Sequence, residues 1–218
     1  MFINLHTHTS ASDPEIVEIV NQYPSQIDSA LKHFSTGIHP WHIHQDQIDE
    51  EMGIIEIVAS TPNCIAIGEC GLDKRIDTPM HLQINVFEKQ LILAEKLQMP
   101  VIIHCVVAFN EVIAIKNRLK IKVPLVIHGF SKNEETAKTL VENGFYLSFG
   151  KYLLRNPELK NVFNFVPNDR FFLETDTAQE DIRAVYNLAA KYKAITLGRL
   201  MEIVQNNFNT VFKNGRMD

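Results

Sequence analysis

The feature that most constrains the fold is a repeated alternation of short apolar runs with segments of helical periodicity. The runs lie at residues 2–5, 15–20, 34–38, 64–68, 101–103, 125–127, 145–148 and 171–173. Several of them are too apolar for a half-exposed strand, which is typical of parallel strands buried on both faces. Strands that alternate with helices indicate the α/β class and a parallel sheet.

Helical patterns separate many of these runs. Apolar side chains keep helical spacing over residues 48–59, 84–97, 181–192 and 200–212. Thr78 is the expected N-cap of the second of these helices, with Pro79 at the first helical position. Ser131 and Glu134 form a capping-box pattern that predicts another helix, which we expect to end at Gly144.

About eight strands with intervening helices predict a TIM-like (β/α)8 barrel, although 218 residues lie near the lower limit for this fold. The first two connections are too short for full helices, so we expect a barrel shortened in its N-terminal units. An open doubly wound sheet is the alternative, which the lack of a Gly-rich nucleotide loop weakens. No low-complexity segment or linker interrupts the chain, so we predict a single domain over residues 1–218.

Composition limits the function classes. A net charge of −5 argues against broad electrostatic binding to nucleic acid or anionic membrane, although a local pocket for an anion is still allowed. The cysteines at 64, 70 and 105 show no CxxC pairing, so we expect neither a disulfide framework nor a zinc ribbon. No targeting or membrane-spanning segment is visible, and we expect a cytoplasmic protein with no membrane partner and no evident protein partner.

Metal-capable side chains follow five of the predicted strands. Taken singly, each has another interpretation: a satisfied core histidine, an N-cap aspartate, or a glutamate at a barrel rim. In a (β/α)8 barrel the carboxyl ends of the strands meet on the face that carries the active site. Imidazole and carboxylate groups gathered there suit one or two divalent cations. The set is His6, His8, Glu69, His104, His128 and Asp176.

Longer motifs accompany these residues in chain order. They are His-Thr-His at 6–8, Gly-Ile-His-Pro at 37–40, Ile-Gly-Glu-Cys-Gly-Leu-Asp at 67–73, Pro-Val-Ile-Ile-His at 100–104, His-Gly-Phe-Ser at 128–131, Gly-Phe-Tyr-Leu-Ser-Phe-Gly at 144–150 and Leu-Glu-Thr-Asp at 173–176. With them, almost the whole chain resembles the TatD-type metal-dependent hydrolases (TatD-related DNases), relatives of the amidohydrolase superfamily.

The resemblance implies an amidohydrolase-like TIM barrel and a metal-dependent hydrolase of ester bonds, foremost a deoxyribonuclease. Its substrate would be DNA or a small phosphodiester, cleaved by attack of a metal-bound hydroxide. Carried over by motif, the ligands of one ion are His6, His8 and Asp176, Glu69 bridges two ions, and the ligands of the second are His104 and His128. The metal is Zn, Mg or Mn, because nitrogen and oxygen donors accept all of these.

Roles beyond metal binding also follow. Asp176 is the candidate to orient the nucleophilic water and take its proton, with Glu69 as the second catalytic residue. The resemblance also implies that His39 would lie at the pocket rim and contact substrate or phosphate. Asp73 and Glu174 are candidates to fix histidine tautomers, or else form a surface ion pair or a cap.

The chain departs from the family pattern in its loops. Val106 stands where an arginine is usual, Lys132 replaces a glycine, and no Pro-containing extension follows Asp176. Such loops set substrate choice. The assignment of the chain as a metal-dependent hydrolase is therefore better supported than the assignment of DNA as its substrate. Trp41 is expected either to stack on a base or to pack on the barrel rim. Other candidates to bind phosphate, or simply solvated charges, are Lys74, Arg75, Lys132, Lys151 and Arg155.

Three further interpretations stay open. A small-molecule amidohydrolase or phosphoesterase fits the same ligands, because they do not distinguish amide, ester and phosphodiester substrates. The stretch at 6–10 with Asp13 is also similar to polymerase-and-histidinol-phosphatase-type phosphoesterases, but no histidine follows His128 to complete that pattern. A non-catalytic scaffold with a relic metal site is the remaining class.

Overall fold

The computed structural model describes residues 1–212. The chain forms two compact units. The terminal unit comprises Met1–Val20 and the chain from Val126 onward, and the central unit comprises Asn21–Leu125. The single domain over residues 1–218 stays a prediction.

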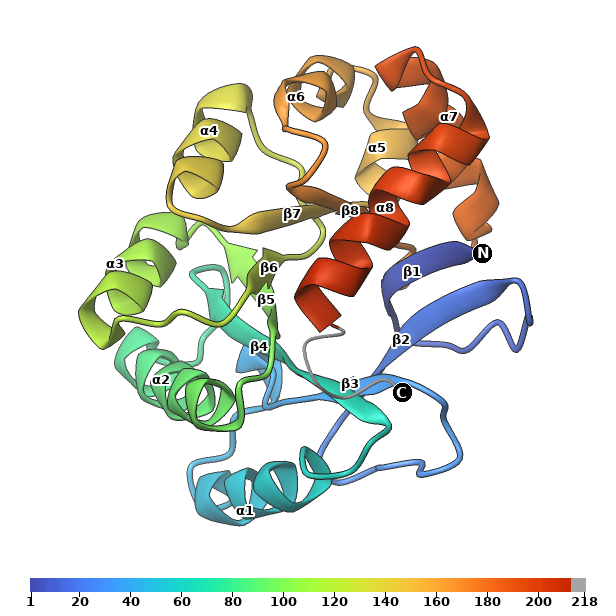
Figure 1. Ribbon diagram of the computed structural model, residues 1–218. Coiled ribbons are helices and arrows are strands. Elements are labelled where there is room, and N and C mark those ends of the chain that lie inside the picture. Colours follow the sequence, from blue (N-terminus) through green and yellow to red (C-terminus); the bar gives the residue numbers. More distant parts are fainter. Residues whose placement is uncertain (213–218) are drawn as a thin grey trace. The chain divides into compact units, whose positions relative to one another are not determined.

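Five strands belong wholly or mainly to the terminal unit, and three lie in the central unit (Figure 1). The first group is β1 (Phe2–Thr7), β2 (Ile16–Gln22), β6 (Leu125–Ile127), β7 (Tyr146–Phe149) and β8 (Phe171–Leu173); the second is β3 (Phe34–Thr36), β4 (Cys64–Asp73) and β5 (Val101–Val106). Each apolar run of the sequence thus overlaps a strand, as predicted, although several strands extend beyond their runs.

All described ladders are parallel. In the terminal unit β1 pairs with β2, and β7 pairs with both β6 and β8. A bridge from Thr7 to Asp176 joins the end of β1 to the segment after β8. In the central unit β4 pairs with β3 and β5. The strands follow one another in chain order from β1 to β8. This order confirms the predicted (β/α)8 fold class.

The helices follow the later strands. In the central unit they are the 3-10 turn η1 (Pro40–His42), α1 (Ile48–Val58), α2 (Met80–Leu97) and α3 (Phe109–Leu119); in the terminal unit they are α4 (Glu134–Glu142), α5 (Lys151–Arg155), α6 (Leu159–Phe165), α7 (Ile182–Lys193) and α8 (Leu197–Phe212). No helix separates β1, β2 and β3 in the described chain, which confirms the shortened N-terminal units. No helix among residues 1–212 is long and apolar enough to cross a membrane.

Burial follows the predicted apolar faces. Figure 1 shows α7 and α8 beside β1 and β8, and the stripe of α8 from Leu200 to Phe212 is buried there. In the same unit, Phe149, Phe163 and Phe171 stack edge to face, with ring centroids 5.1 and 4.9 Å apart. Aromatic pairs in this geometry add to the free energy gained by burial.

Two helix starts differ from expectation. The N-cap of α4 is Asn133, whose side chain accepts a hydrogen bond from the Thr136 N–H. The predicted capping box of Ser131 and Glu134 is therefore wrong. Asparagine is among the strongest N-cap residues and stands closer to the first turn. In α2, Pro79 itself occupies the N-cap, so Thr78 is not the cap. The Thr78 carbonyl instead accepts a hydrogen bond from Gln83.

Candidate functional site

The ends of β1 and β8 bring His6, His8 and Asp176 together in the terminal unit. Backbone hydrogen bonds run from the Asp176 N–H to the His6 carbonyl and from the His8 N–H to the Asp176 carbonyl, at 2.9 and 3.2 Å. The Asp176 Oδ1 atom lies 3.8 Å from His6 Nε2 and 3.5 Å from His8 Nε2. One ligand atom from each of the three lies within 4.8 Å of the others. We call these residues the terminal cluster.

Lys151, the first residue of α5, contacts the other oxygen of the same carboxylate. Its ammonium group donates to Asp176 Oδ2 at 2.6 Å and to the Thr177 hydroxyl at 3.0 Å. Burial opposes ionisation of Asp176, but His128, His6 and Lys151 together hold the pKa of its carboxyl below the usual range. The carboxylate is therefore kept anionic, with Oδ1 directed toward the two imidazoles.

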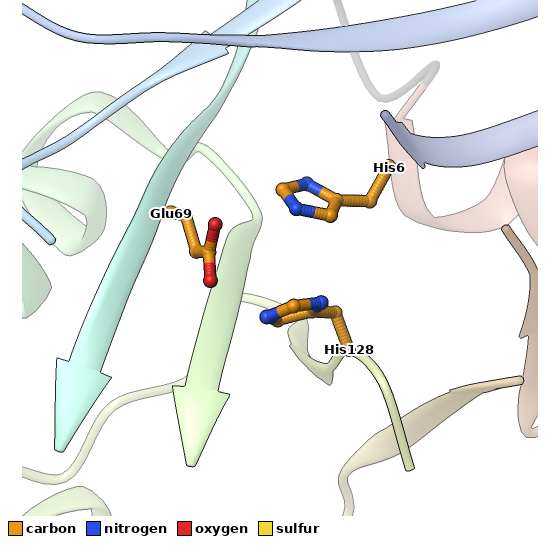
Figure 2. Close-up of side chains that lie close together, drawn as sticks. All are labelled: His6, Glu69 and His128. Atoms are coloured by element: carbon orange, nitrogen blue, oxygen red, sulfur yellow. The ribbon is translucent and has the colours of Figure 1, made fainter. Parts of the chain in front are cut away.

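His128 follows β6 and adds a third imidazole to the terminal unit. Figure 2 shows its ring beside that of His6, and the two ring centroids are 4.4 Å apart. Glu174 Oε1 accepts a hydrogen bond from the Gly129 N–H at 2.7 Å and lies 3.6 Å from His128 Nδ1. Glu174 is buried, and its Oε2 atom has no hydrogen-bond partner.

Asn4 positions the segment that carries Asp176. Its side-chain amide donates to the Thr175 hydroxyl and accepts from the Thr175 N–H, both at 2.9 Å. Asn4 is buried within β1, so it acts as a clamp between the two strand ends. The sequence contained one signal of this role, which was missed: a lone polar residue inside an apolar run.

The central unit assembles a second donor set around Glu69. Its Oε1 atom lies 3.1 Å from His39 Nε2 and 2.9 Å from His104 Nδ1. Figure 2 shows the Glu69 carboxylate projecting from β4. Donor atoms of His39, Glu69 and His104 lie within 4.8 Å of one another, and we call these residues the central cluster.

Asp73, at the end of β4, supports this cluster. Its Oδ2 lies 3.4 Å from His104 Nε2 and accepts a hydrogen bond from the Trp41 indole N–H at 2.8 Å. The Arg75 N–H donates to Oδ1, also at 2.8 Å. Partial burial of Asp73 opposes ionisation, but the hydrogen bonds from Trp41 and Arg75 and the contact with His104 hold the pKa of its carboxyl below normal.

Two buried glutamines on α2 hold the loops of the central cluster. Gln83 accepts from the Asp73 N–H and donates to the Asp73 carbonyl. Gln90 does the same for Ile38, next to His39. Each thus satisfies backbone groups that would otherwise be buried unpaired. Sequence reasoning missed both; the available signal was a pair of amides two helical turns apart on an apolar helix face.

Two glycines flank Glu69 because β4 and β5 approach too closely for a side chain. A Cβ on Gly68 would lie 2.4 Å from the Ile102 carbonyl oxygen, and a Cβ on Gly71 would lie 2.0 Å from that of His104. Both have φ values that L-residues rarely adopt, +133° and +143°. The Gly68–Glu69 peptide bond is cis.

The chemistry of these donor sets fits a divalent cation. Each cluster contains two imidazoles and one carboxylate within reach of a single ion, the ligand types that Zn²⁺ and related ions accept. Two imidazoles converge on one Glu69 oxygen, and two converge on one Asp176 oxygen. In both clusters, the types of donor atom and the distances between them therefore suit a divalent cation.

Some predicted positions need correction. Glu69 and His104 lie within β4 and β5 rather than at their ends, because both strands continue to Asp73 and Val106. His39 is buried against Glu69 rather than placed at a rim, although it also lines a pocket.

The candidate phosphate-binding cations are also partly engaged. Lys151 binds Asp176, whereas Lys74 and Arg155 form ion pairs with Glu111 and Glu180.

Comparisons with known proteins agree with this architecture. A family model described as TatD related DNase matches residues 1–213. The 3'-5' ssDNA/RNA exonuclease TatD of Citrobacter koseri is 33% identical over 148 residues, which cover 65% of this chain but only 56% of that protein. The metal-dependent hydrolase YabD of Bacillus subtilis is 29% identical over 185 residues, covering 77% of this chain and 72% of that protein.

Solved structures show the same fold. The TatD homologue YJJV of Escherichia coli K12 has a TM-score of 0.80 at 20% identity, covering 97% of this chain and 98% of that one. A hydrolase of the TatD family from Entamoeba histolytica has a TM-score of 0.77 at 16% identity, with 97% of both chains covered.

Proposed function

Since the chain belongs to the TatD related DNase family, we propose that it is a divalent-metal-dependent hydrolase of phosphodiester bonds, acting on single-stranded nucleic acid. The observation that carries the proposal is the presence of two clusters, each with two imidazoles and one carboxylate. The substrate class is inferred from relatives named 3'-5' ssDNA/RNA exonuclease TatD. The region that matches this chain spans little more than half of those relatives.

The metal ligands follow the same proposal. His6, His8 and Asp176 would hold one ion, and His104 and His128 would hold a second, with Glu69 available as a ligand of both. The ions are Zn²⁺, Mg²⁺ or Mn²⁺. Bound divalent ions lower the pKa of coordinated water, to about 7 in favourable zinc sites, and stabilise charge that develops on phosphate oxygens.

Residues of the chain supply orientation and proton transfer. Lys151 fixes one oxygen of Asp176, leaving the other to orient the attacking water and accept its proton. Asp73, itself held by the Trp41 indole, orients the His104 ring. His39, which both contacts Glu69 and lines a pocket, meets the substrate beside the reacting phosphate.

A substrate panel tests the proposal. Purified protein is incubated with single-stranded DNA, duplex DNA, RNA and a small phosphodiester, each with Mg²⁺, Mn²⁺ or Zn²⁺. We expect hydrolysis of the single-stranded polymers that chelator stops. Chelator-insensitive hydrolysis, or binding of the metals without hydrolysis of any phosphodiester, would contradict the proposal. A cytoplasmic location is part of the same proposal, and cell fractionation tests it.

A further inference from the structure

A pocket of about 370 Å³ lies in the central unit. Its walls come from the segment after β2, the segment after β3, η1 and the start of α1. The lining side chains used below are Tyr23, His39, His42 and Glu51. His39 is shared, because one edge of its ring contacts Glu69 of the central cluster. An occupant of this pocket would therefore lie next to the proposed metal ligands.

Four aromatic rings lead from this pocket toward solvent. Tyr23 packs on His42, His42 on His39, and His39 on Trp41, with ring centroids 5.1, 5.7 and 5.2 Å apart. We call these four residues the aromatic row. Trp41 is 59% exposed although its indole N–H is tied to Asp73. An exposed indole that is also anchored presents a preformed apolar surface to a flat partner.

The charges favour a base rather than a phosphate as the group that is bound. The pocket lining contains no lysine or arginine and includes the carboxylate of Glu51. The whole chain is acidic, with a net charge of −5, so broad attraction to a polyanion is excluded. Base–aromatic stacking contributes about 1–3 kcal/mol per base without needing positive charge. The volume also lies within the range of ligand pockets, about 300–1,000 Å³.

We propose that the aromatic row and the pocket at its Tyr23 end bind the bases of a single-stranded nucleic-acid end. One base occupies the pocket against Tyr23 and His42, and a neighbouring base stacks on Trp41. This inference rests on the proposed function and names the part of the substrate that this surface recognises. Stacking on rings accepts every base, because each base presents a π-face.

Glu51 adds a preference among bases. Among the side chains that line the pocket, it is the one carboxylate. A carboxylate oxygen accepts from an exocyclic amino group, which cytosine has and thymine lacks. An end cytosine is therefore bound more tightly than an end thymine, and Glu51→Gln reduces this preference because an amide can both donate and accept.

Fluorescence measures this binding without turnover, since Trp41 is the only tryptophan of the chain. Metal-free protein in chelator is titrated with a short oligodeoxycytidine and with an abasic oligomer of the same phosphate count. We expect the oligodeoxycytidine alone to change Trp41 emission, and Tyr23→Leu to weaken its binding at least fivefold. Phe165→Leu, at an exposed aromatic residue of α6, is the matched control and should bind as the wild type does. Equal responses to both oligomers would overturn the inference.

Hydrolysis separates this inference from the proposed function. In the metal-loaded enzyme, abasic residues at the substrate end should lower kcat/KM at least tenfold, and Trp41→Leu should remove most of that difference. Hydrolysis that is indifferent to the end bases would refute the base-binding surface while leaving the phosphodiesterase intact. Base-dependent fluorescence without any hydrolysis would refute the proposed function and support the surface.

Discussion

The terminal and central clusters contain the same donor set but balance its charge differently. In the terminal cluster, the ammonium of Lys151 lies 2.6 Å from one oxygen of Asp176. In the central cluster, one oxygen of Glu69 receives two imidazoles, and a second carboxylate, Asp73, lies 3.4 Å from His104. The lysine repels a cation, whereas the extra carboxylate attracts one. We therefore expect the central cluster to bind the first divalent ion.

The clusters also differ in how they are held. Backbone hydrogen bonds and the Asn4 clamp join β1 to the segment after β8 in the terminal unit. In the central unit, Gln83 and Gln90 of α2 reach the cluster loops, and β4 approaches β5 through glycines. Main-chain pairing and one buried amide thus position the terminal cluster, whereas two buried glutamines and the close approach of two strands position the central cluster.

The largest predicted effect comes from neutralising either carboxylate. Glu69→Gln and Asp176→Asn keep side-chain size, so the fold should persist while kcat/KM falls by about 10³-fold or more, because metal binding and charge stabilisation are lost. Calorimetric titration with Mn²⁺ should show the tighter binding event missing in Glu69→Gln but present in Asp176→Asn. Wild-type turnover in Asp176→Asn would contradict the assigned role.

Alanine substitutions of glycines should destabilise the two units to different extents, because only β4 and β5 of the central unit approach too closely for a side chain. Gly71→Ala forces a Cβ to within 2.0 Å of a backbone oxygen, so we expect the free energy of unfolding to fall by about 3 kcal/mol or more. In the terminal unit, Gly129→Ala meets nothing closer than 3.8 Å and should cost about 1 kcal/mol for its positive φ alone. Urea unfolding measures both.

Gly53→Ala is the control for those variants. This position lies inside α1 with no atom within 4 Å of an added Cβ, so alanine should stabilise the protein by about 0.5–1 kcal/mol. A loss of stability equal to that of Gly71→Ala would show that close approach of β4 and β5 is not the cause.

Removing the side-chain clamps should affect each cluster separately. Gln90→Leu leaves the Ile38 N–H and carbonyl without their partner and should lower the free energy of unfolding by about 2 kcal/mol. It should also weaken only the tighter Mn²⁺ event, because Ile38 positions His39, whose ring contacts the Glu69 carboxylate. Asn4→Leu should weaken only the other event. If both variants weakened the same event, the clusters would not be independently positioned.

The smallest predicted effect belongs to Lys151. Lys151→Met removes a positive charge beside Asp176, so the weaker Mn²⁺ event should tighten by about tenfold, since a unit charge at this range contributes on the order of 1–4 kcal/mol. Arg155→Met on the same helix breaks only a solvent-exposed pair with Glu180 and should leave both events unchanged. Unchanged or weaker Mn²⁺ binding in Lys151→Met would contradict the inference that the charge of Lys151 weakens metal binding at the terminal cluster.

Much of the fold could be predicted because each buried strand is a short local apolar run. Strand positions, the chain-order topology and the shortened N-terminal units all followed from such local patterns. The exact strand ends did not, because the continuation of β4 beyond Gly68 depends on pairing with β5. The α4 cap was misplaced by two residues because Ser131 and Asn133 are both good N-cap residues.

The candidate ligands could be found from residue type at predicted strand ends. The residues that hold them could not, because their partners are distant in sequence: Gln90 binds Ile38 across 52 positions, and Asn4 binds Thr175 across 171. The contact of Lys151 with Asp176 was hidden for the same reason, since α5 and the end of β8 meet only in the folded unit. The metal-ligand roles themselves stay predictions.

Removal and return of the metal test whether the chain is a metal-dependent hydrolase. The protein is stripped with chelator, dialysed, and assayed on end-labelled single-stranded DNA while Mn²⁺ is added stepwise and its binding is followed by calorimetry. We expect no hydrolysis by the stripped protein and a recovery that follows Mn²⁺ occupancy, with no recovery in Asp176→Asn. Full hydrolysis by protein shown to be free of metal would contradict it.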